Sequence, residues 1–107
     1  MSDAEKRLNA IISTSELTGL IMPSISRFFG IVIFMYYDDH APPHFHARYG
    51  ENRVQMNIET LEILEGELPR RALSLVLEWA VLHRNELRLN WQNARDGLPL
   101  LEIEPLQ

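Results

Sequence analysis

The sequence of residues 44–59 is HFHARYGENRVQMNIE, and this stretch decides the fold. Residues 44–49 and 53–59 alternate apolar and polar side chains, which is typical of strands buried on one face. The residues between them, Gly50-Glu51-Asn52, are typical of a turn. The stretch therefore predicts a β-hairpin.

Strand alternation sorts the side chains of this hairpin into two faces. We expect the apolar face to be buried, and its members are Phe45, Ala47, Tyr49, Val54, Met56 and Ile58. We expect the polar face to be accessible, and its members are His44, His46, Arg48, Arg53, Gln55, Asn57 and Glu59. A shift of one residue in the register would exchange the two faces.

The segments beside the hairpin predict further strands. Residues 30–37 (GIVIFMYY) are apolar on both faces, as in a central strand, and the prolines of residues 38–43 end that strand. A shorter strand is expected at residues 62–64, ending at Gly66.

The C-terminal part predicts a helix that begins near Pro69 and ends before Gly97. Apolar side chains recur there at steps of three and four, forming a stripe of Leu73, Val76, Ala80, His83, Leu87, Trp91 and Ala94. Such a helix is long for this chain, so we place a break near Asn85. The tail, residues 98–106, is apolar enough to pack on the body or on a partner. The expected fold class is α+β, a small antiparallel sheet of three or four strands packed against a long C-terminal helix.

Composition limits the class of protein. A chain of 107 residues allows one domain, and the absence of cysteine excludes disulfides, thiolate zinc sites and cysteine nucleophiles. The formal net charge of -5 argues against a strongly basic protein that coats nucleic acid, but it allows a local basic patch. We find no apolar run of about 18 residues and no signal peptide, so we expect a cytoplasmic protein without a membrane partner. Residues 1–21 lack periodicity and are expected to be a flexible extension, dispensable for folding, before a single domain of residues 22–107.

The densest group of functional side chains is in residues 38–46 (DDHAPPHFH). His44 and His46 lie two apart on one strand, so one ion could bridge their imidazoles. Asp39 and His40, on the preceding loop, could complete the site. Because imidazole and carboxylate suit zinc, manganese or iron, these four residues are candidate ligands of a divalent metal such as zinc or manganese. The alternative is a solvated polar face without a ligand.

The same strand permits chemistry without a metal. A small ribonuclease needs a base, an acid and a cation, and His46, His44 and Arg48 are the candidate catalytic residues for these roles. His46 is the central candidate because it lies in the middle of the strand, where its backbone is held. His83 lies on the apolar helical stripe and is interpreted as a structural residue.

The chain also resembles a small bacterial family called domain of unknown function 4160. The resemblance runs from Met22 to about Leu106, and it is carried by residues 22–31 (MPSISRFFGI), 42–47 (PPHFHA), 68–73 (LPRRAL) and 90–91 (NW). Family members usually begin at the position of Met22. A glycine commonly follows the threonine matching Thr60, where this chain has Leu61, which leaves the tightness of that turn open.

The resemblance implies a genomic context rather than a mechanism. Such genes occur in compact two-gene modules similar to toxin–antitoxin pairs. It therefore implies a protein-binding member of such a module, whose partner is a small cognate protein encoded nearby, with a homo-oligomer as a further option. The alternative is a histidine-dependent or metal-dependent ribonuclease or phosphodiesterase that acts on RNA. The two hypotheses are compatible, since a toxin can be a ribonuclease.

Overall fold

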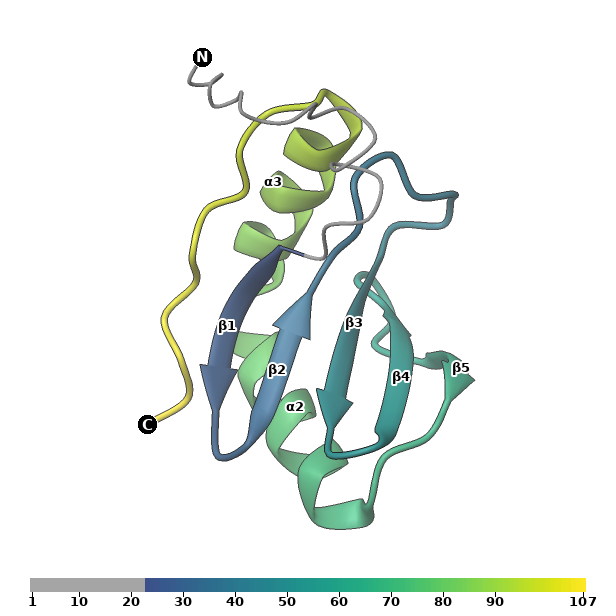
Figure 1. Ribbon diagram of the computed structural model, residues 1–107, viewed down its shortest axis with the longest axis vertical. Coiled ribbons are helices and arrows are strands. Elements are labelled where there is room, and N and C mark those ends of the chain that lie inside the picture. The colour runs from purple at the N-terminus through teal and green to yellow at the C-terminus, as the bar shows by residue number, and fades with distance from the viewer. Residues whose placement is uncertain (1–22) are drawn as a thin grey trace.

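The computed structural model describes residues 23–107, which form a five-stranded antiparallel sheet with two helices on one of its faces (Figure 1). The expectations for residues 1–21 lie outside the described residues. The strand order follows the chain, so each strand pairs with its neighbour in sequence. The elements are β1 (Ser24–Phe28), β2 (Ile31–Phe34), β3 (His44–Tyr49), β4 (Asn52–Asn57), β5 (Ile63–Gly66), α2 (Arg70–Leu82) and α3 (Arg84–Arg95).

The α+β class is confirmed, but the expected three or four strands are wrong, because the sheet has five. The hairpin of β3 and β4 and the short strand β5 lie where the sequence places them. The strand absent from the expectation is β1, which pairs with β2. Its register shifts between Ser24 and Ser26, and both Ile25 and Ser26 are buried. This irregularity removes the alternation by which a strand is recognised.

The expectation of one long C-terminal helix is also wrong. The helical segment breaks at His83, two residues before the expected position, where φ is −123°. The backbone N–H of His83 donates to the carbonyl of Ala80, and its own carbonyl accepts from Leu87 to start α3. On the other side of the break, Arg84 Nε donates to the carbonyl of Ile58 at 3.0 Å, which ties the start of α3 to the end of the hairpin. Neither helix is long and apolar enough to cross a bilayer.

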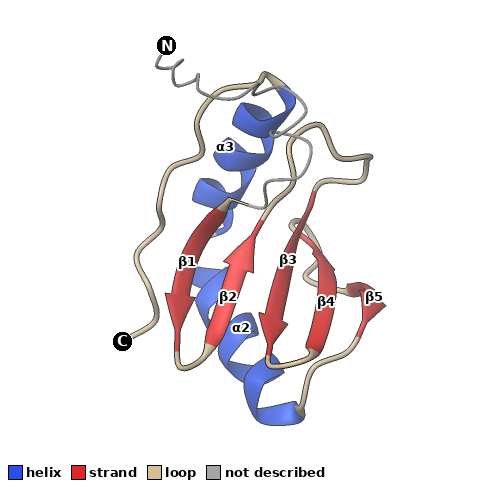
Figure 2. Cartoon of the chain, in the orientation of Figure 1, coloured by secondary structure: helices blue, strands red, loops and turns tan. Residues whose placement is uncertain are grey.

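The core lies between the sheet and the two helices, which cover the same face (Figure 2). Trp79 on α2 is fully buried at its centre, with its ring 5.5 Å from that of Phe28 and 6.1 Å from that of Phe45. The hairpin residues expected in the core are buried, with one correction: Tyr49 is 40% exposed. Tyr49 is the last residue of β3, beside the turn, and its ring lies in a shallow groove near Phe29 and the start of α2.

The C-terminal tail packs on the body and runs beside β1 (Figure 1). Asn90, buried on α3, holds it with two hydrogen bonds: its Nδ2 donates to the carbonyl of Leu101 and its Oδ1 accepts from the Leu101 N–H, both at 2.8 Å. Further along, the N–H of Ile103 donates to the carbonyl of Ile25 at 2.8 Å. The tail therefore covers part of the open edge of β1.

The turn between β4 and β5 keeps a left-handed residue although it has no glycine. Leu61 has a φ of 63°, a conformation that normally favours glycine, and its N–H donates to the carbonyl of Asn57 at 2.8 Å. The side chain of Leu61 packs against the core. Leu61 therefore closes the turn in a strained backbone conformation, while its side chain is partly buried against the core.

Candidate metal centre

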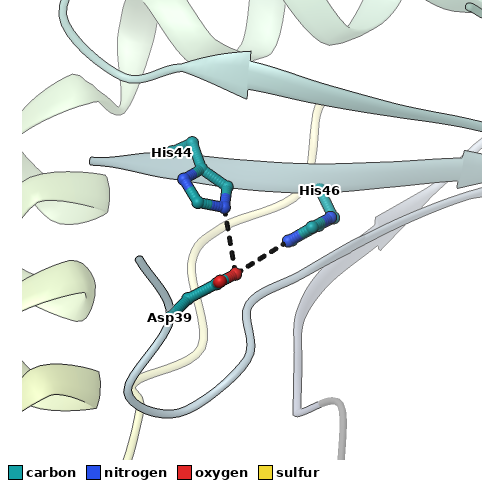
Figure 3. Close-up of side chains that lie close together, drawn as sticks. All are labelled: Asp39, His44 and His46. Carbon is teal, nitrogen blue, oxygen red and sulfur yellow. Dashed lines mark hydrogen bonds and ion pairs between the residues drawn. The ribbon is translucent and has the colours of Figure 1, made fainter. Parts of the chain in front are cut away.

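Three side chains from the densest polar stretch converge at the start of β3 (Figure 3). Asp39 lies on the loop between β2 and β3, and His44 and His46 project from β3. Asp39 Oδ2 lies 3.0 Å from Nε2 of His44 and 3.3 Å from Nε2 of His46. All three atoms lie within 4.8 Å of one another. We call these three residues the Asp–His–His triad.

Backbone contacts hold the loop that carries Asp39. The N–H of Asp38 donates to the carbonyl of Ala94 on α3 at 3.3 Å, and Asp38 has a left-handed φ of 53°. At the other end of the loop, the carbonyl of Pro43 accepts from the N–H of Ile58 at 3.1 Å. The Ala41–Pro42 peptide bond between these anchors is cis. The loop therefore returns over β3 and directs the Asp39 carboxylate toward the two histidines.

His44 was expected to be accessible, but it is only 1% exposed. The returning loop covers it on one side, and its ring lies 5.1 Å from that of Trp91 on α3. Its Nδ1 lies 2.7 Å from the carbonyl oxygen of Pro42. A carbonyl oxygen only accepts, so Nδ1 of His44 carries a proton and donates it to Pro42.

His46 lies at the boundary between the triad and solvent, with a side chain that is 12% exposed. Its ring stacks on Phe34 at 5.1 Å and meets the edge of Tyr36 at 4.9 Å, so its orientation is held by packing. Burial lowers the pKa of His46, and the nearby charges of His44 and Arg53 act in the same direction. The hydrogen bond to Asp39 opposes this shift without reversing it.

Asp39 is the anionic member of the triad. Burial raises the pKa of its carboxyl group, but this effect is outweighed. The backbone N–H of His40 donates to Oδ1 at 2.8 Å, and the two histidines stabilise the carboxylate through hydrogen bonds and charge. The pKa of Asp39 therefore lies below its ordinary value, and the group is ionised near neutral pH.

The triad has the composition and spacing of a metal site. Zinc binds histidine nitrogen and carboxylate oxygen at about 2.0–2.2 Å, so two ligands on a tetrahedral ion lie about 3.4 Å apart. The two separations from Asp39 Oδ2, 3.0 and 3.3 Å, are close to this value, and all three ligand atoms lie within 4.8 Å of one another. Histidines that ligate metals commonly donate their other ring N–H to a backbone carbonyl, as His44 does to Pro42.

The other candidate residues lie outside the triad. The side chain of His40 is 74% exposed, and its Nδ1 is 3.9 Å from Asp39 Oδ1 rather than from the Oδ2 that faces the other two histidines. Its ring lies 5.4 Å from that of His44. Arg48 is half-buried on the same face of β3 as His46, directly across from Arg53 on β4. Glu59, the carboxylate expected on that face, is bound instead by Arg88 of α3 at 2.6 and 2.7 Å.

Sequence reasoning missed the residues that surround the two imidazoles. Phe34 is the cross-strand partner of His46, so the apolar character of β2 on both faces was the signal that an aromatic ring could pack there. No local pattern indicates that Trp91 contacts His44, because that contact depends on how α3 docks on the sheet. The sequence also gives no sign of the acceptor role of the Pro42 carbonyl.

Comparison with known protein families gives a match over most of the described sheet and helices. A family model described as a domain of unknown function, DUF4160, matches residues 30–92. This region includes β2 to β5, α2, most of α3 and the whole triad. The search found no matching curated protein and no matching solved structure. Since the match covers more than half of the chain, the protein belongs to the DUF4160 family.

Proposed function

We propose that this protein is a divalent-metal-dependent phosphodiesterase whose ion is held by the Asp–His–His triad. One observation carries the proposal: a single carboxylate oxygen of Asp39 faces Nε2 of both His44 and His46. This arrangement favours a cation because a neutral imidazole has too few N–H groups to donate to every acceptor that faces it.

A neutral imidazole carries one N–H. In His44, Nδ1 donates to Pro42 and Nε2 faces the Asp39 carboxylate at 3.0 Å, so a positive centre, either a second proton or a metal ion, is needed between Nε2 and the carboxylate. Two lone pairs at that distance repel unless a positive centre lies between them. The lowered pKa of His46 keeps its ring neutral near pH 7, so His46 does not supply the positive centre. A second proton on His44 would leave a charged imidazole that is only 1% exposed, whereas a divalent ion bonded to Asp39 and both histidines satisfies all three groups.

The donor set favours zinc, with manganese as the other candidate, because it combines two imidazoles and one carboxylate. Three protein ligands leave a fourth position for water, which is the composition of catalytic rather than structural zinc sites. An ion bound there would activate water at neutral pH and polarise a phosphoryl oxygen.

The remaining polar groups fit a phosphodiester substrate. Arg48 and Arg53 lie side by side on the open face of the sheet, next to His46, and can stabilise phosphoryl charge. His40 is exposed beside Asp39, within reach of a substrate at the triad. A mechanism that uses the histidines without a metal has less support, because His44 is buried with both ring nitrogens engaged.

The proposal is tested with protein purified without a histidine tag. We expect the wild type to bind one zinc or manganese ion per chain and to cleave RNA or bis-p-nitrophenyl phosphate only when the metal is present. His46→Asn should lose both properties and keep its fold. His83→Asn is the matched control: it removes a histidine at the helix junction, where Nδ1 contacts Glu86, and it should keep the metal. Metal binding that survives His46→Asn, or cleavage that persists in EDTA, contradicts the proposal.

A protein-binding role in a toxin–antitoxin-like module is a second proposal, and it is favoured by the outer edge of β5, which pairs with no other strand among residues 23–107. Ile63 and Leu64 are each 42% exposed there, and unpaired strand edges are sites for strand addition. The edge also carries Glu62, Glu65 and Glu67, so two copies of the chain would repel each other there. A basic partner is therefore favoured over a homo-oligomer. Expressing the chain alone and with its genomic neighbour, and recording growth and co-purification, tests this role.

A further inference from the structure

A groove of about 290 Å³ opens on the face of the sheet opposite the helices and begins at His46. We call it the β4–β5 groove. Its lining residues are Tyr36, His46, Arg53, Val54, Gln55, Glu65 and Gly66. Since His46 belongs both to this groove and to the triad, a ligand in the groove lies next to the proposed metal.

The backbone of β5 approaches β4 closely enough to form the floor of the groove. Gly66 pairs with Val54 and has a φ of 83°. A Cβ atom at Gly66 would lie 2.2 Å from the carbonyl oxygen of Arg53, so no other residue fits there without movement. The Arg53 carbonyl also accepts from the N–H of Glu67 at 2.9 Å. The floor is therefore a fixed part of the sheet.

One part of the groove is cationic. Arg53 lies directly opposite Arg48 in the sheet, and like charges in that relation destabilise a strand pair. Within residues 23–107 no carboxylate forms an ion pair with either arginine. A bound anion such as a phosphate would relieve this repulsion.

Another part of the groove presents a hydrogen-bond donor beside an acceptor. Gln55 and Glu65 are cross-strand partners, and Gln55 Nε2 donates to Glu65 Oε1 at 3.1 Å. This bond uses one N–H of the amide, leaving the other N–H as a donor, while the carboxylate keeps further acceptor sites. Arg53 lies two residues before Gln55 on the same face of β4, which corresponds to about 7 Å along a strand.

Among the nucleobases, guanine has the edge that complements this pair. Its Watson–Crick edge has the O6 acceptor beside the N1–H and N2–H donors, which match the Gln55 donor and the Glu65 carboxylate. Adenine, cytosine and uracil do not offer two adjacent donors to one carboxylate. We propose that the β4–β5 groove binds one guanine nucleotide of the substrate, with its phosphate at Arg53 and its base at Gln55 and Glu65.

The assignment of this nucleotide to a substrate rests on the proposed phosphodiesterase function, but its binding is measured separately. The experiment is calorimetric titration of the full chain, in EDTA and low salt, with the 5′-monophosphates of guanosine, adenosine, cytidine and uridine. We expect the guanine nucleotide to bind about tenfold more tightly than the other three, because two hydrogen bonds to a charged group are gained.

Two variants separate the contributions of the base and the phosphate. Glu65→Gln should remove the preference for guanine and leave binding of the adenine nucleotide unchanged. Arg53→Gln should weaken all four nucleotides about tenfold and leave unphosphorylated guanosine unaffected. The matched control is Glu67→Gln, an exposed glutamate outside the groove lining, which should behave as the wild type.

The groove assignment is overturned if the wild type binds no nucleotide or binds all four equally. It is also overturned if Glu65→Gln keeps the preference for guanine while its thermal unfolding profile matches that of the wild type. Failure of the metal proposal gives a different result, since guanine-selective binding in EDTA would persist while zinc fails to bind. Conversely, if the protein binds zinc but shows no preference among the nucleotides, the groove assignment is wrong and the metal proposal stands.

Discussion

Asp39→Asn is the substitution that most sharply separates a metal site from an ion pair. When His44 is neutral in the metal-free wild type, the carboxylate faces the lone pair of its Nε2 at 3.0 Å, which is repulsive. The amide of asparagine has nearly the same shape, and its N–H₂ group can donate to that lone pair. A net intramolecular hydrogen bond contributes about 1 kcal/mol. We therefore expect the free energy of unfolding of metal-free Asp39→Asn to equal that of the wild type or exceed it by about 1 kcal/mol.

Zinc should reverse this order. A ligand that binds only the folded state at 100 times its Kd adds about 2.7 kcal/mol to the free energy of unfolding. For a domain of this size, that corresponds to an increase in Tm of about 10–20 °C. Asp39→Asn lacks the anionic ligand, so zinc at the same concentration should raise its Tm by much less. The substitution is therefore neutral or stabilising without metal and destabilising with it.

The assay is urea unfolding at pH 7.5, in EDTA and in zinc, with midpoints compared at equal m-values. Asp38→Asn is the matched control, because Asp38 is an exposed neighbour whose left-handed backbone also suits asparagine. Two results refute the reasoning. A loss of about 3–5 kcal/mol by Asp39→Asn in EDTA would indicate a buried ion pair with a protonated histidine. Equal zinc stabilisation of Asp39→Asn and the wild type would place the ion elsewhere.

Three further predictions concern stability. Burial lowers the pKa of His46 below 6.5 in the folded state, so the unfolded state binds more protons as the pH falls. The contribution of His46 to metal-free stability should therefore be complete above pH 6.5 and decline as the pH falls below it. Urea midpoints at pH 7.5 and 5.5 measure this decline, and the His46→Asn variant should lack the part that His46 causes. Gly66→Ala should lower the free energy of unfolding by about 2–4 kcal/mol, because the added Cβ meets the Arg53 carbonyl. Gly97 has a similar φ but open space around it, so Gly97→Ala should lower the free energy of unfolding by only about 1 kcal/mol. Equal losses, measured by thermal unfolding, would contradict the close approach of the two strands at Gly66. Asn90→Ala should cost about 2–4 kcal/mol and speed hydrogen exchange at the Leu101 amide, and unchanged exchange there would show that the tail is held by other contacts.

The parts of the fold that sequence predicts are those with regular periodicity. The alternation of residues 44–59 gave the hairpin, with Phe45 and Met56 in the core. Strand β1 could not be found in this way because its bulge makes Ile25 and Ser26 consecutive buried residues. The break at His83 was misplaced for the opposite reason: the apolar stripe keeps its steps of three and four through the break, so periodicity does not reveal it.

The site was predictable in its residues but not in its burial. The spacing of His44 and His46 on one strand, with Asp39 close by in sequence, was sufficient to nominate three ligands that the structure brings together. Alternation says which face a side chain occupies, but not what covers that face. His44 is covered by a returning loop and by Trp91, which lies far along the chain, and such tertiary packing leaves no local pattern.

The order of the strands has a consequence for the synthesis of the protein. Each strand pairs with the one made just before it, so a growing chain can add strands without waiting for distant segments, and such local pairing favours fast folding. The three triad residues emerge from the ribosome well before Trp91 and Ala94, so the aromatic cover of His44 and the α3 anchor of the Asp39 loop are added after the ligands are translated. The tail segment that pairs with Ile25 is translated after all five strands of the sheet. Until Ile103 is translated, the edge of β1 therefore lacks the hydrogen bond that the tail makes to it.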